Sequence, residues 1–563
     1  MKFKNMTDDE KKYFAEVYKN KKLSWDERMQ VLMKFTGKSE RTVRKWASDK
    51  LNLSEKEEPV SQEYEEAKQR VFNKKKKRFI ITYAQNNTPV HLKFFYNVLK
   101  YAEHINADVH VIAGRYKNPT SIWSMGQQEE ERWSPVVKDY LDANRHDIHK
   151  YLSIMSDVKV HPTAVNPMTG MQGMSGINSC IFGHPKMQME TIPVLEKSKP
   201  KMMLTTGACT VKNYTDSKSG KKGEFHHVIG FAVVEIKDDE TFFVRQVSAE
   251  DNGDFTDLYH RVEFTGKEVT KVFNNPLDKS DWLDEYFETK AVELIGEATV
   301  SNVNTIEGCI LGDLHWGHHD PEVIKGTHKM LNKIVPKNVV LHDVFDGYSI
   351  SHHEMKNPFA QYGKEVRNEN DLKKEVDEMM EGLRGFSGYN NVIIVRSNHD
   401  DFIDRWLQNG DWKKQPTPKN APLYMEYSSI LLNQYGKGGD IKGVIPELIN
   451  REFPDFITLG RRDSYKILEW EVGQHGDVGS NGSRGSLLQF RKLNTKIIVG
   501  HYHSPGRKDG ALAVGTSTHM RVGYNMGPSS WLQSHVIIHE NGKAQHINFI
   551  KDENGVAHYT TLK

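Results

Sequence analysis

Five apolar stretches in the second half of the chain each lead into residues that can bind a divalent metal ion or transfer a proton. The first, residues 308–311, is followed by Asp313 and His315, and alternation along a strand puts these two side chains on the same side of the chain. A carboxylate can bridge two cations, and a neutral imidazole is a ligand that suits Mn, Fe or Zn. The other four stretches lead into residues of similar chemistry, namely Asp343, Asp346, Asn398, His399, His475, His501 and His503.

The elements that would position these side chains are predicted as parallel strands separated by helices. Residues 338–341, 391–395 and 496–499 have the length and composition of buried strands, and apolar residues recur at helical spacing over 321–334. Ligands of α/β sheets bind in the crevice beyond the carboxyl ends of the strands. A single histidine or aspartate at a strand end is more often structural. Five such groups in succession predict one shared site.

The order Asp-x-His, Asp-x-x-Asp, Asn-His-Asp, His and Gly-His-x-His resembles the calcineurin-like metallophosphoesterase superfamily over about residues 305–525. The resemblance implies a sandwich of β-sheets flanked by helices. It also implies two divalent metal ions, Mn²⁺ first, with Fe or Zn as alternatives. Two such cations can clamp the attacking and leaving oxygens of a displacement at phosphorus. By this resemblance one ion would be held by Asp313, His315, Asp343 and His503, and the other by Asp343, Asn398, His475 and His501.

The resemblance further implies roles for residues that bind no metal. His399 would face the scissile phosphate, where it stabilises negative charge or protonates the leaving oxygen, and Asp346 would orient His399. Asp400 and Asp477 are candidate partners that fix the tautomers of the imidazoles.

Two residues depart from the pattern of the superfamily. His342 and Ser397 stand where glycine usually precedes a ligand. Neither change removes a ligand, so we expect an effect on the shape of the pocket and not on metal binding. We expect His342 to lie beside the ligands or at the surface.

The first 51 residues are predicted to form a small helical domain. Residues 24–27, Ser-Trp-Asp-Glu, have the form of a capping box, and Gly37 supplies a turn before a second helix. This is the helix-turn-helix pattern. The segment holds 14 Lys or Arg and 8 Asp or Glu, a net charge of +6, which suits a phosphate backbone. The alternative is a helical hairpin used for packing or oligomerisation. The candidate DNA contacts of the second helix are Arg41, Thr42, Arg44 and Lys45.

Between the two ends of the chain we expect a linker and a second domain. Residues 52–78 are predicted to be a charged linker, in which Lys75 and Lys76 either contact a phosphate backbone or are only solvated. Residues 79–300 begin with a strand-helix-strand pattern, which implies a parallel sheet, and carry no catalytic constellation. The predicted fold class is α/β throughout, with the metallophosphoesterase domain over residues 301–563.

Bulk composition limits the classes of function. The chain of 563 residues is long enough for several domains, and its 77 basic and 75 acidic residues leave a net charge of only +2. Three widely spaced cysteines argue against a disulfide framework and for a reducing compartment. No apolar run is long enough for a signal peptide or a membrane span. We therefore expect a cytoplasmic protein that does not act on membranes.

These patterns favour a metal-dependent DNase, with DNA as the partner and a homo-oligomer left open. Arg484, close to His475 in the sequence, is a further candidate DNA contact. The layout of the whole chain also resembles the pre-early DNA-degradation and DNA-transfer proteins of large tailed phages, which implies action on host DNA in an infected bacterium. One alternative is a phosphatase or small-molecule phosphodiesterase with an accessory DNA-binding domain. Another is a DNA-binding transfer or regulatory protein whose metal site is structural.

Overall fold

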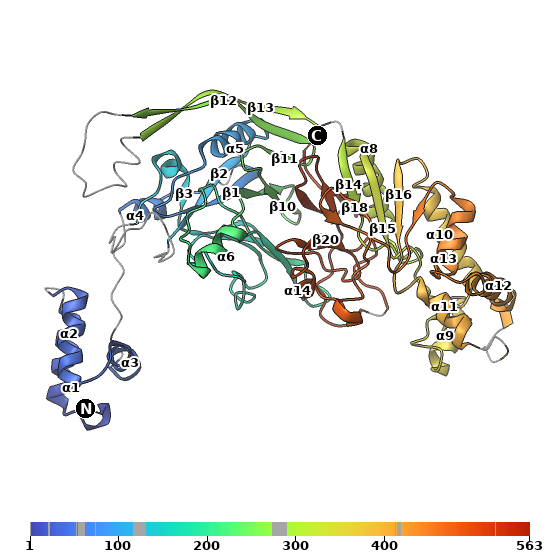
Figure 1. The fold of residues 1–563 in the computed structure, drawn as a ribbon, viewed down its shortest axis with the longest axis horizontal. Helices are drawn as coiled ribbons and strands as arrows, with labels where there is room; N and C mark the ends of the chain where they lie inside the picture. Colours follow the sequence, from blue (N-terminus) through green and yellow to red (C-terminus); the bar gives the residue numbers. More distant parts are fainter. Residues whose placement is uncertain are drawn as a thin grey trace. The chain divides into compact units, whose positions relative to one another are not determined.

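The computed structural model describes residues 2–20, 23–51, 53, 62–73, 75–115, 131–272, 290–303, 305–410, 413, 418–523 and 525–562. Helices and several β-sheets are mixed along the chain, so the predicted α/β class is confirmed. The chain divides into a small helical unit within residues 1–62 and a large unit that contains every sheet (Figure 1).

The helical unit has the predicted local structure. The capping box forms, because Ser24 Oγ accepts from the Glu27 amide at 3.2 Å while the Glu27 carboxylate accepts from the Ser24 amide at 2.8 Å. Gly37, with φ of 65°, ends the helix in a left-handed conformation. The buried side chains of Phe14, Leu32 and Val43 bring the helices together. The elements are η1 (Phe3–Asn5), α1 (Asp8–Lys19), α2 (Trp25–Thr36) and α3 (Glu40–Leu51).

A five-stranded sheet in the order β10-β9-β1-β2-β3 begins the large unit. The parallel pair β1–β2 with α5 between them is the predicted strand-helix-strand unit. Alternation along β1 buries Ile80 against α5 and Ile81 against the opposite layer. The elements are α4 (Gln62–Lys68), β1 (Arg78–Gln85), α5 (Leu92–His104), β2 (Asp108–Gly114), η2 (Pro135–Tyr140), β3 (Leu141–Asp142), α6 (Lys218–His226), β9 (Gly230–Ile236) and β10 (Phe242–Ser248).

A six-stranded sheet in the order β17-β16-β15-β14-β23-β24 holds the strands predicted to lead into the site. β14 to β17 are parallel, and β23 and β24 are antiparallel. The predicted helix over 321–334 forms as α8. The elements are β14 (Ile306–Ile310), α8 (Pro321–Ile334), β15 (Pro336–His342), α10 (Leu372–Arg384), β16 (Asn391–Val395), β17 (Ile457–Thr458), β23 (Ser534–Ile538) and β24 (Ala544–Asn548).

A ten-stranded sheet crosses the domain boundary predicted near residue 300. Antiparallel pairing of Arg507 with Met189 joins C-terminal strands to strands of the middle region, so the two predicted domains share one sheet. Such pairing between distant segments leaves no trace in local periodicity. The strands, in sheet order, are β18 (Lys466–Ile467), β19 (Trp470–Glu471), β20 (Lys496–Val499), β22 (Ala511–Ala513), β21 (Gly506–Lys508), β7 (Gln188–Ile192), β8 (Lys201–Thr205), β6 (Ser179–Phe182), β5 (Leu152–Met155) and β4 (Arg145–His149).

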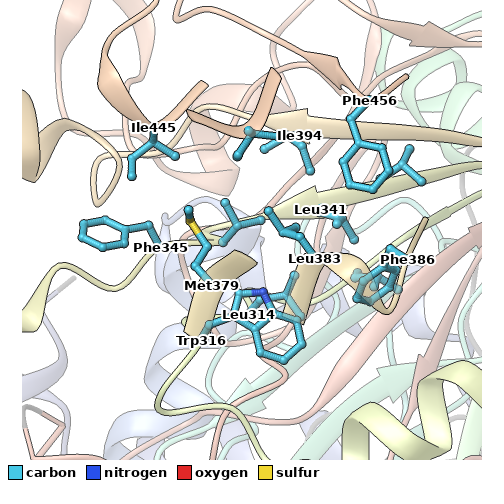
Figure 2. Close-up of a cluster of buried hydrophobic side chains, with 14 of the residues drawn as sticks. Leu314, Trp316, Leu341, Phe345, Met379, Leu383, Phe386, Ile394, Ile445 and Phe456 are labelled. Carbon is cyan, nitrogen blue, oxygen red and sulfur yellow. The ribbon is translucent and has the colours of Figure 1, made fainter. Parts of the chain in front are cut away.

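The six-stranded sheet is covered on both faces. On one face, Val340 and Ile393 share a buried cluster with Ile498 and Leu512 of the ten-stranded sheet. On the other face, Leu341 and Ile394 alternate toward the helices, where Figure 2 shows them packed with Met379, Leu383 and Phe386. Burial on both faces fixes the register of β14 to β16, because a slip of one residue would turn every side chain to the wrong face.

The remaining elements extend the large unit. A helical lobe made of α9 and α11 to α13 is inserted between β15 and β17, and a long two-stranded ribbon of β12 and β13 precedes β14 (Figure 1). The three cysteines are buried and free, and no helix among the described residues is long and apolar enough to span a membrane. The elements are β11 (Phe255–Asp257), β12 (His260–Val272), β13 (Lys290–Asn302), η4 (Tyr348–Ile350), α9 (Pro358–Arg367), α11 (Asp401–Asn409), η6 (Pro418–Asn420), α12 (Ala421–Lys437), α13 (Val444–Glu452), η7 (Ser480–Gly482), α14 (Leu487–Phe490), β25 (Ile550–Lys551) and β26 (Ala557–His558).

Candidate metal centre

The segments that follow β14, β15 and β20 bring four predicted ligands into one buried group. Asp313, His315, Asp343 and His503 each offer one ligand atom, and these atoms all lie within 4.8 Å of one another. They are at most 5% exposed. Carboxylates and imidazoles gathered in this way away from water are suited to hold a divalent cation.

Asp313 contacts both histidines of the C-terminal Gly-His-x-His segment. Its Oδ2 accepts from the His501 amide at 2.7 Å and lies 3.1 Å from His503 Nε2. Burial alone would raise the pKa of Asp313, but the hydrogen bond and charge of His503 outweigh it and hold this pKa below its usual value. Oδ1 is buried and has no hydrogen-bond partner among the described residues. A charged carboxylate therefore has one oxygen left for a cation.

Asp343 occupies the position between the two predicted ligand sets. Its Oδ2 lies 3.1 Å from His475 Nε2 and 3.3 Å from His315 Nε2. Its Oδ1 is buried, and no residue that the structure describes makes a hydrogen bond to it. Burial opposes ionisation, but His475, His315 and His399 together hold the pKa of Asp343 well below its usual value. Asp343 thus touches one imidazole of each predicted set, as a bridging carboxylate must.

The second predicted ligand set is brought together by pairwise contacts. His501 Nδ1 lies 3.1 Å from Asn398 Oδ1, and His475 pairs with Asp343 as described above. Burial alone would lower the pKa of His475, but the Asp343 carboxylate raises it to about 9. In the absence of a metal ion, a proton on His475 therefore neutralises part of the charge of Asp343.

Strained backbone marks the same residues. Positive φ values occur at His315 (43°), Asp343 (48°), His501 (75°) and His503 (54°). L-residues rarely adopt this conformation, and each such residue costs on the order of 1–3 kcal/mol, so the surrounding structure must impose it. Gly500 provides the space, because a Cβ there would lie 2.3 Å from Asp313 Oδ1.

Asp346 and His399 meet through the backbone of Asp346 and not through a short contact with its carboxylate. The Asp346 carboxylate lies 2.9 Å from His315 Nδ1 and 3.9 Å from His399 Nδ1. His399 Nδ1 instead donates to the backbone carbonyl of Asp346 at 2.6 Å. Since a carbonyl can only accept, Nδ1 carries a proton and Nε2 is the atom left to face a substrate. Asp346 therefore orients His399 through its backbone and His315 through its side chain.

Asp400 and Asp477 also differ from the prediction, since neither has a hydrogen bond to an imidazole among the described residues. Asp400 accepts from the Ser397 amide at 2.9 Å, and burial raises its pKa to about 7. Asp477 binds both terminal nitrogens of Arg461, at 2.8 and 3.0 Å. The fixed fork of a guanidinium matches both oxygens of a carboxylate at once, which a single imidazole nitrogen cannot do.

Two residues of the centre were missed or undervalued by sequence reasoning. Arg461 also binds Asp401 at 2.8 Å, so it ties the segment after His399 to the segment after His475. Nothing in its local sequence indicates this. His342 is fully buried and forms a further candidate group with Asp313 and His475, with its Nδ1 3.4 Å from His475 Nδ1. Its place immediately before Asp343 was the available signal.

The predicted DNA contacts lie at several places. On α3, Arg41, Arg44 and Lys45 are exposed and Thr42 is half-buried, and Arg44 pairs with Glu40 at 2.6 Å. In the large unit, Lys75 is exposed, Lys76 is half-buried and donates to Asn106, and the exposed Arg484 lies on the segment that follows His475.

Comparison with known proteins gives one relative. Protein A1 of Escherichia phage T5 is 30% identical over 491 residues, which cover 84% of this chain and 82% of that protein. No family model matches the sequence, and no solved structure matches. The match extends well beyond the metal centre, so it includes most of both the middle and the C-terminal regions.

Proposed function

The chain belongs to the family of Protein A1 of Escherichia phage T5, and we propose that it is a phage-encoded, two-metal-dependent phosphodiesterase that hydrolyses DNA. The observation that carries this proposal is the unsatisfied charge of the centre. Within the described part of the chain, Asp313 and Asp343 each have a buried oxygen without a hydrogen-bond partner, and both carboxylates contact imidazoles. Buried charge of this kind costs several kcal/mol unless a counter-charge is present.

The donor set fits two divalent cations. Asp313, His315, Asp343 and His503 would hold one, and Asp343, Asn398, His475 and His501 would hold the other. A bound pair of cations supplies charge neutralisation at phosphorus and lowers the pKa of a water that serves as the nucleophile. The order of these residues along the chain, and the two sheets packed face to face behind them, support membership of the calcineurin-like metallophosphoesterase superfamily.

The proposed role of His399 is to act on the substrate. Its ring stacks on Phe402 with 4.7 Å between centroids, and the Asp346 carbonyl holds its Nδ1 proton. These two contacts fix the direction of Nε2. We propose that Nε2, when protonated, donates to the phosphate oxygens and delivers a proton to the leaving oxygen.

The choice of DNA as the substrate rests on the rest of the chain. The exposed Arg41 and Lys45 of α3 lie on the second helix of a helix-turn-helix arrangement, where such residues contact DNA. The resemblance of the whole layout to phage DNA-degradation proteins supports the same choice. In an infected bacterium this activity would act on host DNA in the cytoplasm.

The direct test is hydrolysis by the purified full chain. With Mn²⁺ we expect cleavage of DNA, followed on linear, circular and single-stranded substrates, and no cleavage in EDTA. Turnover of a small phosphodiester such as bis-p-nitrophenyl phosphate without cleavage of any DNA would instead show a small-molecule phosphodiesterase.

The role of His399 is tested separately. His399→Ala should abolish turnover and leave the bound metal content unchanged, whereas His104→Ala, at an exposed position on α5, should change neither. Loss of metal from His399→Ala would show that this residue is a ligand.

The role of α3 is tested by the dependence of DNA binding on salt. Changing both Arg41 and Lys45 to Ala should lower the slope of log K against log[salt] by about 2 for duplex DNA, since each lost phosphate contact contributes roughly 0.9. An unchanged slope would show that α3 serves packing.

A further inference from the structure

A line of aromatic rings leads from His399 to the surface of the helical lobe. Phe402 stacks on His399, and His352 packs edge-on against Phe402 with 4.9 Å between ring centroids. The ring centroids of His352 and His353 lie 3.9 Å apart, and both of these imidazoles are exposed. Ring contacts therefore join His399 to two exposed imidazoles.

The next helix, α9, carries further exposed rings. Phe359 and Tyr362 of α9 are 87% and 72% exposed, and Val366 is 65% exposed. Spacings of three and four residues place all three on one face of the helix. A single exposed apolar residue is normal, but a row of them with two aromatic rings marks a binding surface. We call His352, His353, Phe359 and Tyr362 the ring surface.

The ring surface is fixed rigidly to the metal centre. Lys364 of α9 is fully buried, and its ammonium donates to the Tyr348 carbonyl at 2.6 Å and pairs with Glu354 at 2.6 Å. The Tyr348 amide in turn donates to the half-buried Glu375 carboxylate at 2.6 Å. Tyr348 lies two residues after Asp346, so the loop that carries Asp346 also anchors α9. A surface held this way can place a ligand accurately.

Cations accompany the rings. Lys356 is exposed on the same segment of chain, where Arg367 pairs with Glu369 at 2.8 Å, and Arg405 is exposed on α11. Burial, the neighbouring His353 and the charge of Arg405 together hold the pKa of His352 below its usual value. Aromatic rings interspersed with cations are the combination by which proteins bind single-stranded nucleic acids, because bases stack on the rings and phosphates pair with the cations.

From these contacts we infer that the ring surface binds an unpaired DNA strand and leads it to His399. This inference rests on the proposed function and narrows its substrate to DNA that has, or can open, a single-stranded segment. In a duplex the faces of the bases are covered by their neighbours, so the exposed rings of α9 have nothing to stack on. An unpaired strand presents both base faces and a flexible backbone.

The test is the binding of fluorescein-labelled oligothymidylate to the full chain, followed by anisotropy in EDTA. Changing both Phe359 and Tyr362 to Ala should weaken binding at least about tenfold, the effect of losing one or two stacked bases. Binding of a duplex of the same length should stay within about twofold. The matched control changes both Leu432 and Tyr435 to Ala on α12, where these side chains are 69% and 56% exposed, and should alter neither affinity.

A second double variant separates the effect of ring stacking from that of apolar contact. Changing Phe359 and Tyr362 to Leu keeps apolar area and removes the rings, so we expect it to weaken strand binding as the Ala changes do. Full binding by the Leu variant, equal losses for strand and duplex, or no binding of the strand by the parent would each overturn the inference. A difference in oligomeric state between the parent and the variants, measured by sedimentation, would also overturn it, because a second copy of the chain would then cover this face.

The inference and the proposed function fail in different ways. Strand binding is measured without metal and does not require hydrolysis. A chain that binds the strand through Phe359 and Tyr362 but cleaves no DNA with Mn²⁺ would contradict the proposed function alone. A chain that cleaves DNA with Mn²⁺ while the Ala variant binds the strand as the parent does would contradict the inference alone.

Discussion

The metal centre can be compared with a charged network in the middle region, where Arg245 of β10 lies between Glu235 of β9 and Asp257 of β11. Both places bury carboxylates, the centre beside the parallel strands β14 and β15 and the network on the antiparallel strands β9 and β10 and on β11. In the network, Arg245 binds both oxygens of Asp257 at 2.6 and 2.7 Å and also binds Glu235. The hydroxyl of Tyr101 donates to Asp257 at 2.7 Å, and the Thr561 amide donates to Glu235 at 2.6 Å.

The difference lies in the atoms that have no partner. Each oxygen of Glu235 and Asp257 accepts at least one hydrogen bond, whereas one oxygen each of Asp313 and Asp343 accepts none from the residues that the structure describes. A network that satisfies its own charges stabilises a fold and needs nothing further. A centre that leaves buried carboxylate oxygens without hydrogen bonds can accept a cation from outside. The two groups therefore differ in whether their carboxylate oxygens are hydrogen-bonded, and not in burial or charge.

The largest expected effect is at the unsatisfied centre. Asp343→Asn removes the carboxylate that touches both ligand sets, so we expect DNA hydrolysis to fall on the order of a thousandfold, in line with several kcal/mol of lost charge stabilisation. The parent should gain about 2.7 kcal/mol of stability at Mn²⁺ a hundredfold above its Kd, and the variant should gain almost none. Calorimetry with and without Mn²⁺ measures this. Asp257→Asn is the control, because it should lower stability but keep the response to Mn²⁺.

The next effect is at the satisfied network. Arg245→Met leaves two buried carboxylates without their counter-charge, which should cost about 3–5 kcal/mol of unfolding free energy in urea titrations. Arg145→Met breaks an exposed pair with Asp157, made at 3.0 Å, and should cost less than about 1 kcal/mol. Equal costs for the two variants would mean that burial of the network does not raise its contribution to stability.

A smaller effect should appear as a pH dependence of metal binding. Asp343 raises the pKa of His475 to about 9 in the metal-free protein, so below pH 9 a metal ion must displace a proton from this imidazole. The affinity for Mn²⁺ should therefore rise about tenfold per pH unit from pH 7 to pH 9 and then level off. Titration calorimetry in buffers of different ionisation enthalpy should show one proton released. If the affinity for Mn²⁺ does not change with pH over this range, His475 is not the group that loses a proton on metal binding.

The smallest expected effect is at Arg461, which links the segment after His399 to the segment after His475. Arg461→Gln frees Asp401 and Asp477 from each other, and we expect about a tenfold loss of Mn²⁺ affinity, as is typical for partners that position ligands. Arg462→Gln, at the exposed neighbouring position, should have no effect. If the two variants bind Mn²⁺ equally, Arg461 contributes to stability only.

Much of the fold near the centre could be predicted from local pattern. The helix over 321–334 and the strands over 391–395 and 496–499 form where periodicity placed them, and the capping box at Ser24 forms as expected. These features depend on residues that are close together in the sequence, so local patterns predict them directly. The residues that line the strand ends follow for the same reason, since a strand end fixes which side chains reach the edge of the sheet.

Other features depend on segments that are far apart in the chain. The pairing of β21 with β7 merges two predicted domains into one sheet, and Asp346 directs its carboxylate to His315 and only its backbone to His399. Arg461 unites two loops that no sequence pattern connects. The sequence by itself determined which chemical groups stand at the ends of the strands. Only the tertiary structure decided which group each of them touches, because partners are chosen by distance in the packed chain and not by spacing along it.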